Sequence, residues 1–184
     1  MELKANKKVM TRVTRDNGES DMYSREWDRI SDAERQIIEA KQSAFPIKVG
    51  AIARELGLTV KVSTLKAGIS GEIRRDNSNY TIKVNRHDVK ERQRFTIAHE
   101  IAHYLLHREE IGDGLVDDIL YRSRLSSALE AQANRLAADI IMPWPLIQVH
   151  LQDFRSLSLP HKIEMLSRLM EVSTTAVKIR LEKK

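Results

Sequence analysis

The spacing of apolar residues along the first third of the chain predicts two helices before any strand begins. Residues 31–44 begin with Ser31 and carry Glu34 three positions later, which is the pattern of a capping box at a helix N-terminus. The stretch 47–56 has apolar residues at helical spacing and is followed by Gly57, a residue typical of helix C-termini. We therefore expect two consecutive helices in this region.

An alternating pattern replaces the helical one further along. The segment 59–65, TVKVSTL, is short, alternating and rich in β-branched residues, which is typical of a strand. Residues 71–85, GEIRRDNSNYTIKVN, predict a hairpin whose turn is the polar run DNSN at 76–79. The last strand of this hairpin places three side chains on one face: Tyr80, Ile82 and Val84.

Two longer helical patterns follow the predicted hairpin. Residues 89–108 carry an apolar stripe, and Asp88 is the expected N-cap. A polar segment with two glycines at 109–124 predicts a loop, and a second long helix is expected over 126–142. The sequence MPWP should end that helix, because a residue before proline avoids the α region.

The C-terminal part of the chain has the spacing of a helical hairpin. Short helices are expected at 160–171 and 174–182, with Ser173 as the N-cap of the second. Together the patterns predict an α+β fold, in which a small antiparallel sheet packs on two central helices and is followed by a helical tail with helix-turn-helix spacing.

Composition narrows the classes of function. The 184 residues are enough for one domain with a real core, and the absence of cysteine excludes disulfides and thiolate metal sites. The net charge of +5 comes from basic residues interleaved with acids, which favours a solvated basic surface over a dedicated nucleic-acid site. The chain has neither a secretory signal pattern nor an apolar run of membrane-spanning length, so we expect a cytoplasmic protein with no membrane partner.

The motif HEIAH at residues 99–103 is a candidate metal site. His99 and His103 are four positions apart, so on a helix both imidazoles point to the same side and can share one ion. Glu100 lies about 100° further round the helix, which places its carboxylate beside the ion. A hydrolytic zinc site needs this arrangement of two nitrogen ligands and a nearby carboxylate.

A catalytic zinc site needs a third protein ligand. His107 lies about 12 Å from His99 along a straight helix, too far for both to reach the same ion. Glu130 on the second long helix is the better candidate, because a helix–loop–helix return can bring it back to the motif. Asn134 shares its face and is expected to accept the spare N–H of a ligand histidine; a local hydrogen bond is the equally open alternative.

The segment RQRFTIAHEIAHYLLH, followed by EAQANRLAADIIMP, resembles the ImmA/IrrE family of bacterial and phage zinc metallopeptidases. The resemblance covers about residues 45–182. It implies a zincin-like minimal metallopeptidase, with His99, His103 and Glu130 as ligands of one Zn²⁺ per chain and Glu100 as the catalytic acid and base. It also implies a protein substrate, a helix-turn-helix transcriptional repressor whose site-specific cleavage derepresses a stress, mobile-element or defence operon.

The expected domain organisation has three parts. A flexible polar arm covers 1–23, the metallopeptidase domain covers 24–145, and a C-terminal helical subdomain covers 146–184. The strand before the motif helix is expected to bind substrate in extended form by strand addition, through three residues: Tyr80, Ile82 and Val84.

Two alternatives involve nucleic acid. In the first, residues 161–184 act as the helix-turn-helix of a DNA-binding regulator, the metal site is structural, and the basic residues Lys178, Arg180, Lys183 and Lys184 face DNA. In the second, the peptidase is activated by single-stranded DNA. The basic residues considered for that contact are Arg74, Arg75, Lys83, Arg86, Lys90, Arg92 and Arg94. A solvated basic face is the competing explanation for both sets.

Overall fold

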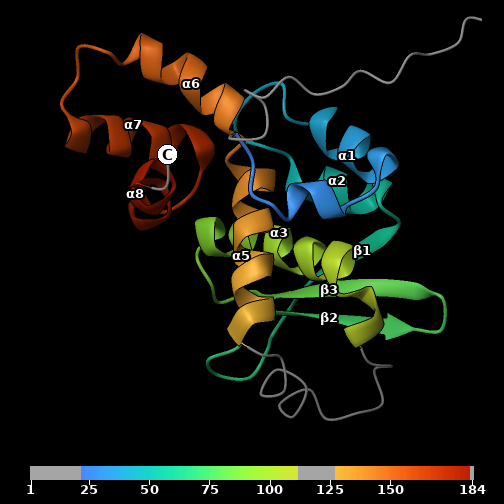
Figure 1. Ribbon diagram of the computed structural model, residues 1–184. Helices are drawn as coiled ribbons and strands as arrows, with labels where there is room; N and C mark the ends of the chain where they lie inside the picture. The colour runs from blue at the N-terminus through green and yellow to red at the C-terminus, as the bar shows by residue number, and fades with distance from the viewer. Residues whose placement is uncertain (1–21, 112–126, 183–184) are drawn as a thin grey trace, which may run out of the picture.

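The computed structural model of the protein describes residues 22–111 and 127–182 (Figure 1). Within these residues the fold is α+β, with one three-stranded sheet and seven α-helices, so the predicted fold class is confirmed. The polar arm expected over residues 1–23 lies almost entirely outside the described residues, as does most of the loop expected over 109–124.

The first helices form where the sequence indicates them. Helix α1 (Asp32–Glu39) begins with a capping box, in which the Ser31 hydroxyl accepts from the Glu34 N–H at 3.3 Å and the Glu34 carboxylate accepts from the Ser31 N–H at 2.9 Å. Helix α2 (Val49–Glu55) has Leu56 as its C-cap and is followed by Gly57, whose φ of +79° glycine adopts at little cost. Helix α1 is shorter than the expected 31–44 segment.

The sheet contains strands β1 (Leu58–Ser63), β2 (Gly71–Asp76) and β3 (Asn79–Asn85) in the order β1-β3-β2. The β2–β3 hairpin is antiparallel as predicted, but β1 runs parallel to β3. The sheet is therefore mixed, and the expectation of a purely antiparallel sheet is wrong. After β1 the chain continues to β2, which lies two places away in the sheet. The hairpin then returns as β3, which fills the place between β1 and β2 and runs in the same direction as β1.

Helix α3 (Lys90–Leu106) covers one face of the sheet, and α5 (Ser127–Ile141) lies across α3 (Figure 1). Both helices carry fully buried alanines. The fully buried residues include Ala98 and Ala102 of α3 and Ala133 and Ala137 of α5. Because alanine adds little bulk, the two helix axes can approach closely, which brings side chains of both helices together at one place.

The C-terminal helices α6 (Trp144–Asp153), α7 (Leu159–Met170) and α8 (Thr174–Glu182) group beside one end of α5, away from the sheet (Figure 1). Helix α6 was not expected from the sequence. The two prolines that end α5 also start α6, since Pro143 is its N-cap and the next proline lies in its first turn, where no N–H is needed. No helix in the described ranges has the length and apolar character needed to cross a bilayer.

Candidate metal centre

Three side chains expected from the sequence meet where α5 crosses α3. The Nε2 atoms of His99 and His103 are 3.0 Å apart, and each lies 3.3 Å from one carboxylate oxygen of Glu130 in the first turn of α5. Four-coordinate zinc, with bonds of about 2.0–2.1 Å, separates its donor atoms by roughly 3.3 Å. The donor spacing and the nitrogen and oxygen chemistry of this group therefore fit a zinc ion.

Within this group, His99 and Glu130 shift each other's pKa towards the charged forms. Hydrogen bonds from His103 and His99 hold the pKa of the Glu130 carboxyl far below its usual range, although partial burial opposes the shift. Burial disfavours the charged form of His99, but its hydrogen bond to Glu130 and the nearby Glu100 charge outweigh this and raise its pKa. A cation that binds here replaces protons on the imidazoles, so metal binding and proton release are coupled.

Asn134 lies where its expected role requires it. Its side-chain oxygen is 3.1 Å from the Nδ1 atom of His99, one helical turn beyond Glu130 on α5. An amide oxygen accepts hydrogen bonds, so His99 donates from Nδ1, and loss of the Nε2 proton would leave the lone pair of that nitrogen for a metal ion. The centroid of the Phe95 ring lies 6.5 Å from that of this imidazole.

Glu100 faces a different side of α3 from the two histidines. Its side chain is 4% exposed and lies next to β2, where an added Cβ on Gly71 would be 3.6 Å from Glu100 Oε1. The carboxylate thus sits beside the ligand group, between α3 and the sheet, as the offset of one residue on a helix predicts.

The strand expected to bind substrate does not have a free edge. Strand β3 is the central strand and is hydrogen-bonded on both sides, and Ile82 and Val84 are 0% and 1% exposed. Tyr80 packs edge-on against the Tyr104 ring, with centroids 4.9 Å apart. The prediction of strand addition at Tyr80, Ile82 and Val84 is therefore wrong. The sequence shows which residues alternate, but the strand order depends on how the loops pack.

Strand β2 is the edge strand on the Glu100 side, and among the described residues it pairs with β3 alone. Its first residue, Gly71, has no side chain to separate the backbone from α3. A hollow of about 570 Å³ has a mostly apolar lining that includes Asn134, Phe95 and Ile179. Both features lie near the candidate metal centre, and neither was identified from the sequence.

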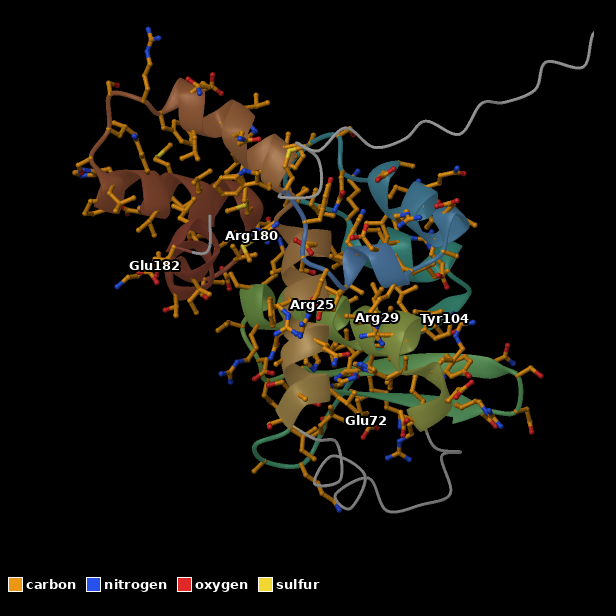
Figure 2. The ribbon with its side chains drawn as sticks, viewed as in Figure 1. Arg25, Arg29, Glu72, Tyr104, Arg180 and Glu182 are labelled. Atoms are coloured by element: carbon orange, nitrogen blue, oxygen red, sulfur yellow. The ribbon has the colours of Figure 1, made fainter. Side chains whose placement is uncertain are left out.

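Arg180, one of the C-terminal basic residues considered for contacts with DNA, is not available for that role. Arg180 of α8 is 7% exposed, and it binds Asp139 of α5 at 2.8 Å and the backbone oxygen of Met142 at 3.1 Å. Figure 2 shows Arg180 on the side of α8 that faces α5, whereas Glu182 lies at the outer end. Arg180 therefore holds the helix in place, which does not suit contacts with DNA bases or phosphates.

Most of the basic residues considered for single-stranded DNA also form ion pairs. The pairs are Arg74 and Lys83 with Glu72, Lys90 and Arg94 with Glu171, and Arg92 with Asp88. Figure 2 places Glu72 on the sheet, below the crossing of the two central helices. Such pairing lowers the local positive charge that attracts phosphates, so it favours the interpretation of a solvated, partly neutralised face.

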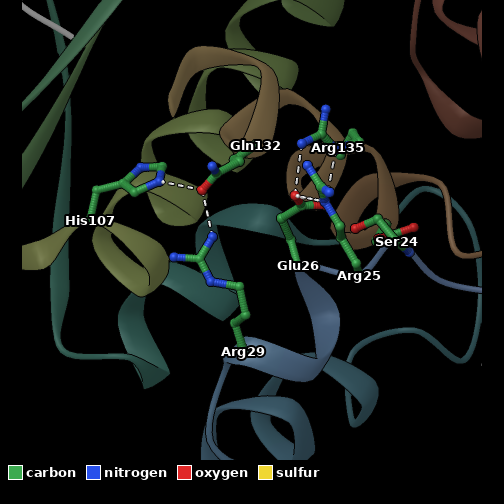
Figure 3. Close-up of polar contacts among 8 residues, drawn as sticks. Ser24, Arg25, Glu26, Arg29, His107, Gln132 and Arg135 are labelled. Atoms are coloured by element: carbon green, nitrogen blue, oxygen red, sulfur yellow. Dashed lines mark hydrogen bonds and ion pairs between the residues drawn. The ribbon is translucent and has the colours of Figure 1, made fainter. Parts of the chain in front are cut away.

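An N-terminal segment that the sequence did not connect with the site packs along α5. Glu26 is 1% exposed and accepts two hydrogen bonds from Arg135, at 2.8 and 3.0 Å (Figure 3). The backbone N–H of Ser24 donates to Asp139 at 2.8 Å. The partners on α5 share one face, so this segment braces the helix that supplies Glu130.

Comparisons with known proteins agree with this geometry. Residues 53–182 match the peptidase family M78, described as the IrrE N-terminal-like domain. The radiation response metalloprotease IrrE of Deinococcus radiodurans is 37% identical over 79 residues, which are 43% of this chain and 24% of that protein. A solved structure described as a Mycobacterium tuberculosis transcriptional regulator shares the fold, with a TM-score of 0.59 at 20% identity over 89% of this chain and 48% of that one. This chain thus spans less than half the length of either protein.

Proposed function

Because the chain belongs to the ImmA/IrrE family of M78 metallopeptidases, we propose that it is a zinc-dependent endopeptidase that cleaves a helix-turn-helix transcriptional repressor at a specific site. The observation that carries the proposal is the convergence of His99, His103 and Glu130 beside the buried carboxylate of Glu100. Cleavage would remove the repressor from a stress, mobile-element or defence operon, which places the reaction in the cytoplasm.

Three side chains would hold the metal. His99 and His103 offer neutral Nε2 atoms and Glu130 offers a carboxylate, a donor set that suits zinc better than magnesium or calcium, which prefer oxygen ligands alone. Bound zinc supplies a Lewis acid that polarises a carbonyl and makes water more acidic. Asn134 keeps the His99 ring in the orientation and tautomer that this role requires.

Glu100 would move the proton. Its carboxylate accepts a proton from the attacking water and then donates that proton to the nitrogen of the leaving amine as the peptide bond breaks. Its burial between α3 and β2 keeps bulk water from competing for the proton during this transfer.

The β2 edge would hold the substrate. An extended segment of the repressor would add to the side of β2 that has no strand partner among the described residues, through backbone hydrogen bonds, next to Glu100. An apolar side chain of the substrate would fill the hollow beside Asn134 and Phe95, where the lining is mostly apolar.

Cleavage can be tested directly. The zinc-loaded protein is incubated with the helix-turn-helix repressors encoded near its own gene, and intact masses are followed with and without a chelator. We expect one repressor to give two fragments, none when chelator is present, and none with Glu100→Gln, which should keep its zinc because Glu100 is not among the three converging ligands. Cleavage by Glu100→Gln at the wild-type rate would contradict the role of Glu100, and cleavage unaffected by chelator would contradict the metal mechanism.

A further inference from the structure

His107 is a buried histidine that the proposed catalytic machinery does not use. It follows the last residue of α3, is 5% exposed, and lies outside the group of converging ligands. Its ring centroid is 5.3 Å from that of His103, and the two Nδ1 atoms are 3.1 Å apart. On its other side, His107 Nε2 is 3.2 Å from the side-chain oxygen of Gln132 on α5 (Figure 3).

The direction of these hydrogen bonds follows from the ligand role of His103. A neutral imidazole carries one proton, and a ligand nitrogen must offer a lone pair. The Nε2 atom of His103 faces His99 and Glu130, so its proton is on Nδ1 and is donated to His107. His107 then accepts at Nδ1 and holds its own proton on Nε2, which it donates to Gln132.

Arg29 fixes the orientation of Gln132, the last residue in this series of hydrogen bonds. The guanidinium has only donors, and its Nη1 atom donates to the same Gln132 oxygen that His107 contacts (Figure 3). If the amide were flipped, its NH₂ group would face two other donors. The arginine therefore holds the Gln132 oxygen towards His107. Every donor in this series of hydrogen bonds then meets an acceptor.

We propose that His107 is a positioning residue, held by Gln132 and Arg29, that fixes the tautomer and ring orientation of the ligand His103. The inference rests on the proposed metal site and extends it. Each ligand histidine then has its own acceptor for the Nδ1 proton, Asn134 for His99 and His107 for His103. An acceptor of this kind raises the basicity of the ligand and prevents the ring from rotating away, which strengthens metal binding.

The acceptor role can be separated from simple packing with two substitutions at one position. His107→Phe keeps a ring but removes the acceptor, whereas His107→Asn places an amide oxygen near the position of Nδ1. Zinc dissociation constants are measured by competition with a chromophoric chelator, and the visible spectrum of the Co²⁺-loaded protein reports the ligand geometry. We expect roughly 10–100-fold weaker zinc binding and an altered cobalt spectrum for His107→Phe, with His107→Asn close to wild type.

A second pair of variants guards against a misfolded His107→Phe protein. Gln132→Leu removes the acceptor that holds His107 and should also weaken zinc binding, although less. The matched control is Gln148→Leu at an exposed position of α6, which should leave the zinc dissociation constant unchanged. Wild-type zinc affinity and cobalt spectrum in both His107→Phe and Gln132→Leu would overturn the positioning role, as would equal losses in His107→Phe and His107→Asn. A wild-type protein that binds no zinc would instead contradict the proposed function itself.

Discussion

At the scale of single residues, the spacing of side chains on one helix accounts for most of the candidate site. His99 and His103 converge because four residues make about one turn, and Glu100 points elsewhere because it is one residue away. These relations depend only on helix geometry, so they could be predicted from the sequence. The close approach of Gly71 to α3 could not, since it joins two elements whose packing no local pattern specifies.

Gly71 gives a test at this scale. An added Cβ would lie 2.2 Å from Thr96 Cγ2 and 3.0 Å from the backbone oxygen of Lys83, so β2 and α3 must move apart beside Glu100. We expect Gly71→Ala to cost about 1–3 kcal/mol of unfolding free energy and to reduce repressor cleavage, while zinc content is retained. Urea unfolding, elemental analysis and the cleavage assay measure the three effects.

Gly50 supplies the matched control for this substitution. It lies in α2 with nothing within 4 Å of an added Cβ, so Gly50→Ala should stabilise the protein by about 0.5–1 kcal/mol. If Gly71→Ala behaved like Gly50→Ala, the tight contact between β2 and α3 would not be important for the site.

At the scale of elements, local signals identified helices and strands but not all of their partners. The capping box of α1 formed as predicted, whereas Asp88 does not cap α3: Val89 is the N-cap and Asp88 pairs with Arg92 at 3.7 Å. Local patterns thus locate a helix N-terminus to within about one residue, but they do not always identify the capping residue. The contact between residues 24–29 and α5 joins segments more than a hundred residues apart, so no local pattern reveals it.

The Glu26–Arg135 contact predicts a dependence of stability on pH. Burial raises the pKa of Glu26, but hydrogen bonds from Arg135 and Arg25 outweigh burial and lower it from 4.5 to about 2. Because the folded-state pKa is the lower one, the stabilisation is complete above pH 4.5 and is lost as the pH falls towards 2. It amounts to roughly 3 kcal/mol at neutral pH.

Removing the charge should remove this dependence. We expect Glu26→Gln to lower the unfolding free energy at pH 7 by roughly 3 kcal/mol. The decline of the unfolding free energy between pH 4.5 and 2 should be flatter in this variant than in the wild type. Urea unfolding across this range measures both. A Glu26→Gln protein that lost stability with acid as steeply as wild type would show that other carboxylates cause the decline.

At the scale of the whole molecule, a buried ion pair links the C-terminal helix α8 to the central helix α5. Asp139 is fully buried in α5, and Arg180 of α8 binds it at 2.8 Å. The sequence-based interpretation placed Arg180 on a DNA-facing surface, because its spacing in the helix alone does not show which side packs. One of the basic residues on which the DNA-binding alternative relied is therefore buried and cannot contact DNA. The described part of the C-terminal tail is better understood as a support for α5.

This pair makes a testable contribution to stability. Arg180→Met leaves the Asp139 carboxylate buried without its partner and should cost about 3–5 kcal/mol. The double variant Arg180→Met with Asp139→Asn should recover part of that loss, because the amide oxygen can still accept from the Ser24 N–H and no charge remains buried. Thermal and urea unfolding of the three proteins check this; equal stability of the single and double variants would contradict an ion-pair origin.

The sequence by itself determined the features that lie within a few consecutive residues: the paired histidines, the adjacent glutamate, the capping box of α1 and the hairpin. The geometry of a helix or a hairpin fixes the relative positions of these residues, whatever the rest of the fold is. Only the tertiary structure decided that β3 is the central strand, that Arg29 and Gln132 hold His107, and that Arg180 faces inwards. Those outcomes depend on packing between segments far apart in the chain, where burial and charge pairing choose among arrangements that are equally compatible with the local pattern.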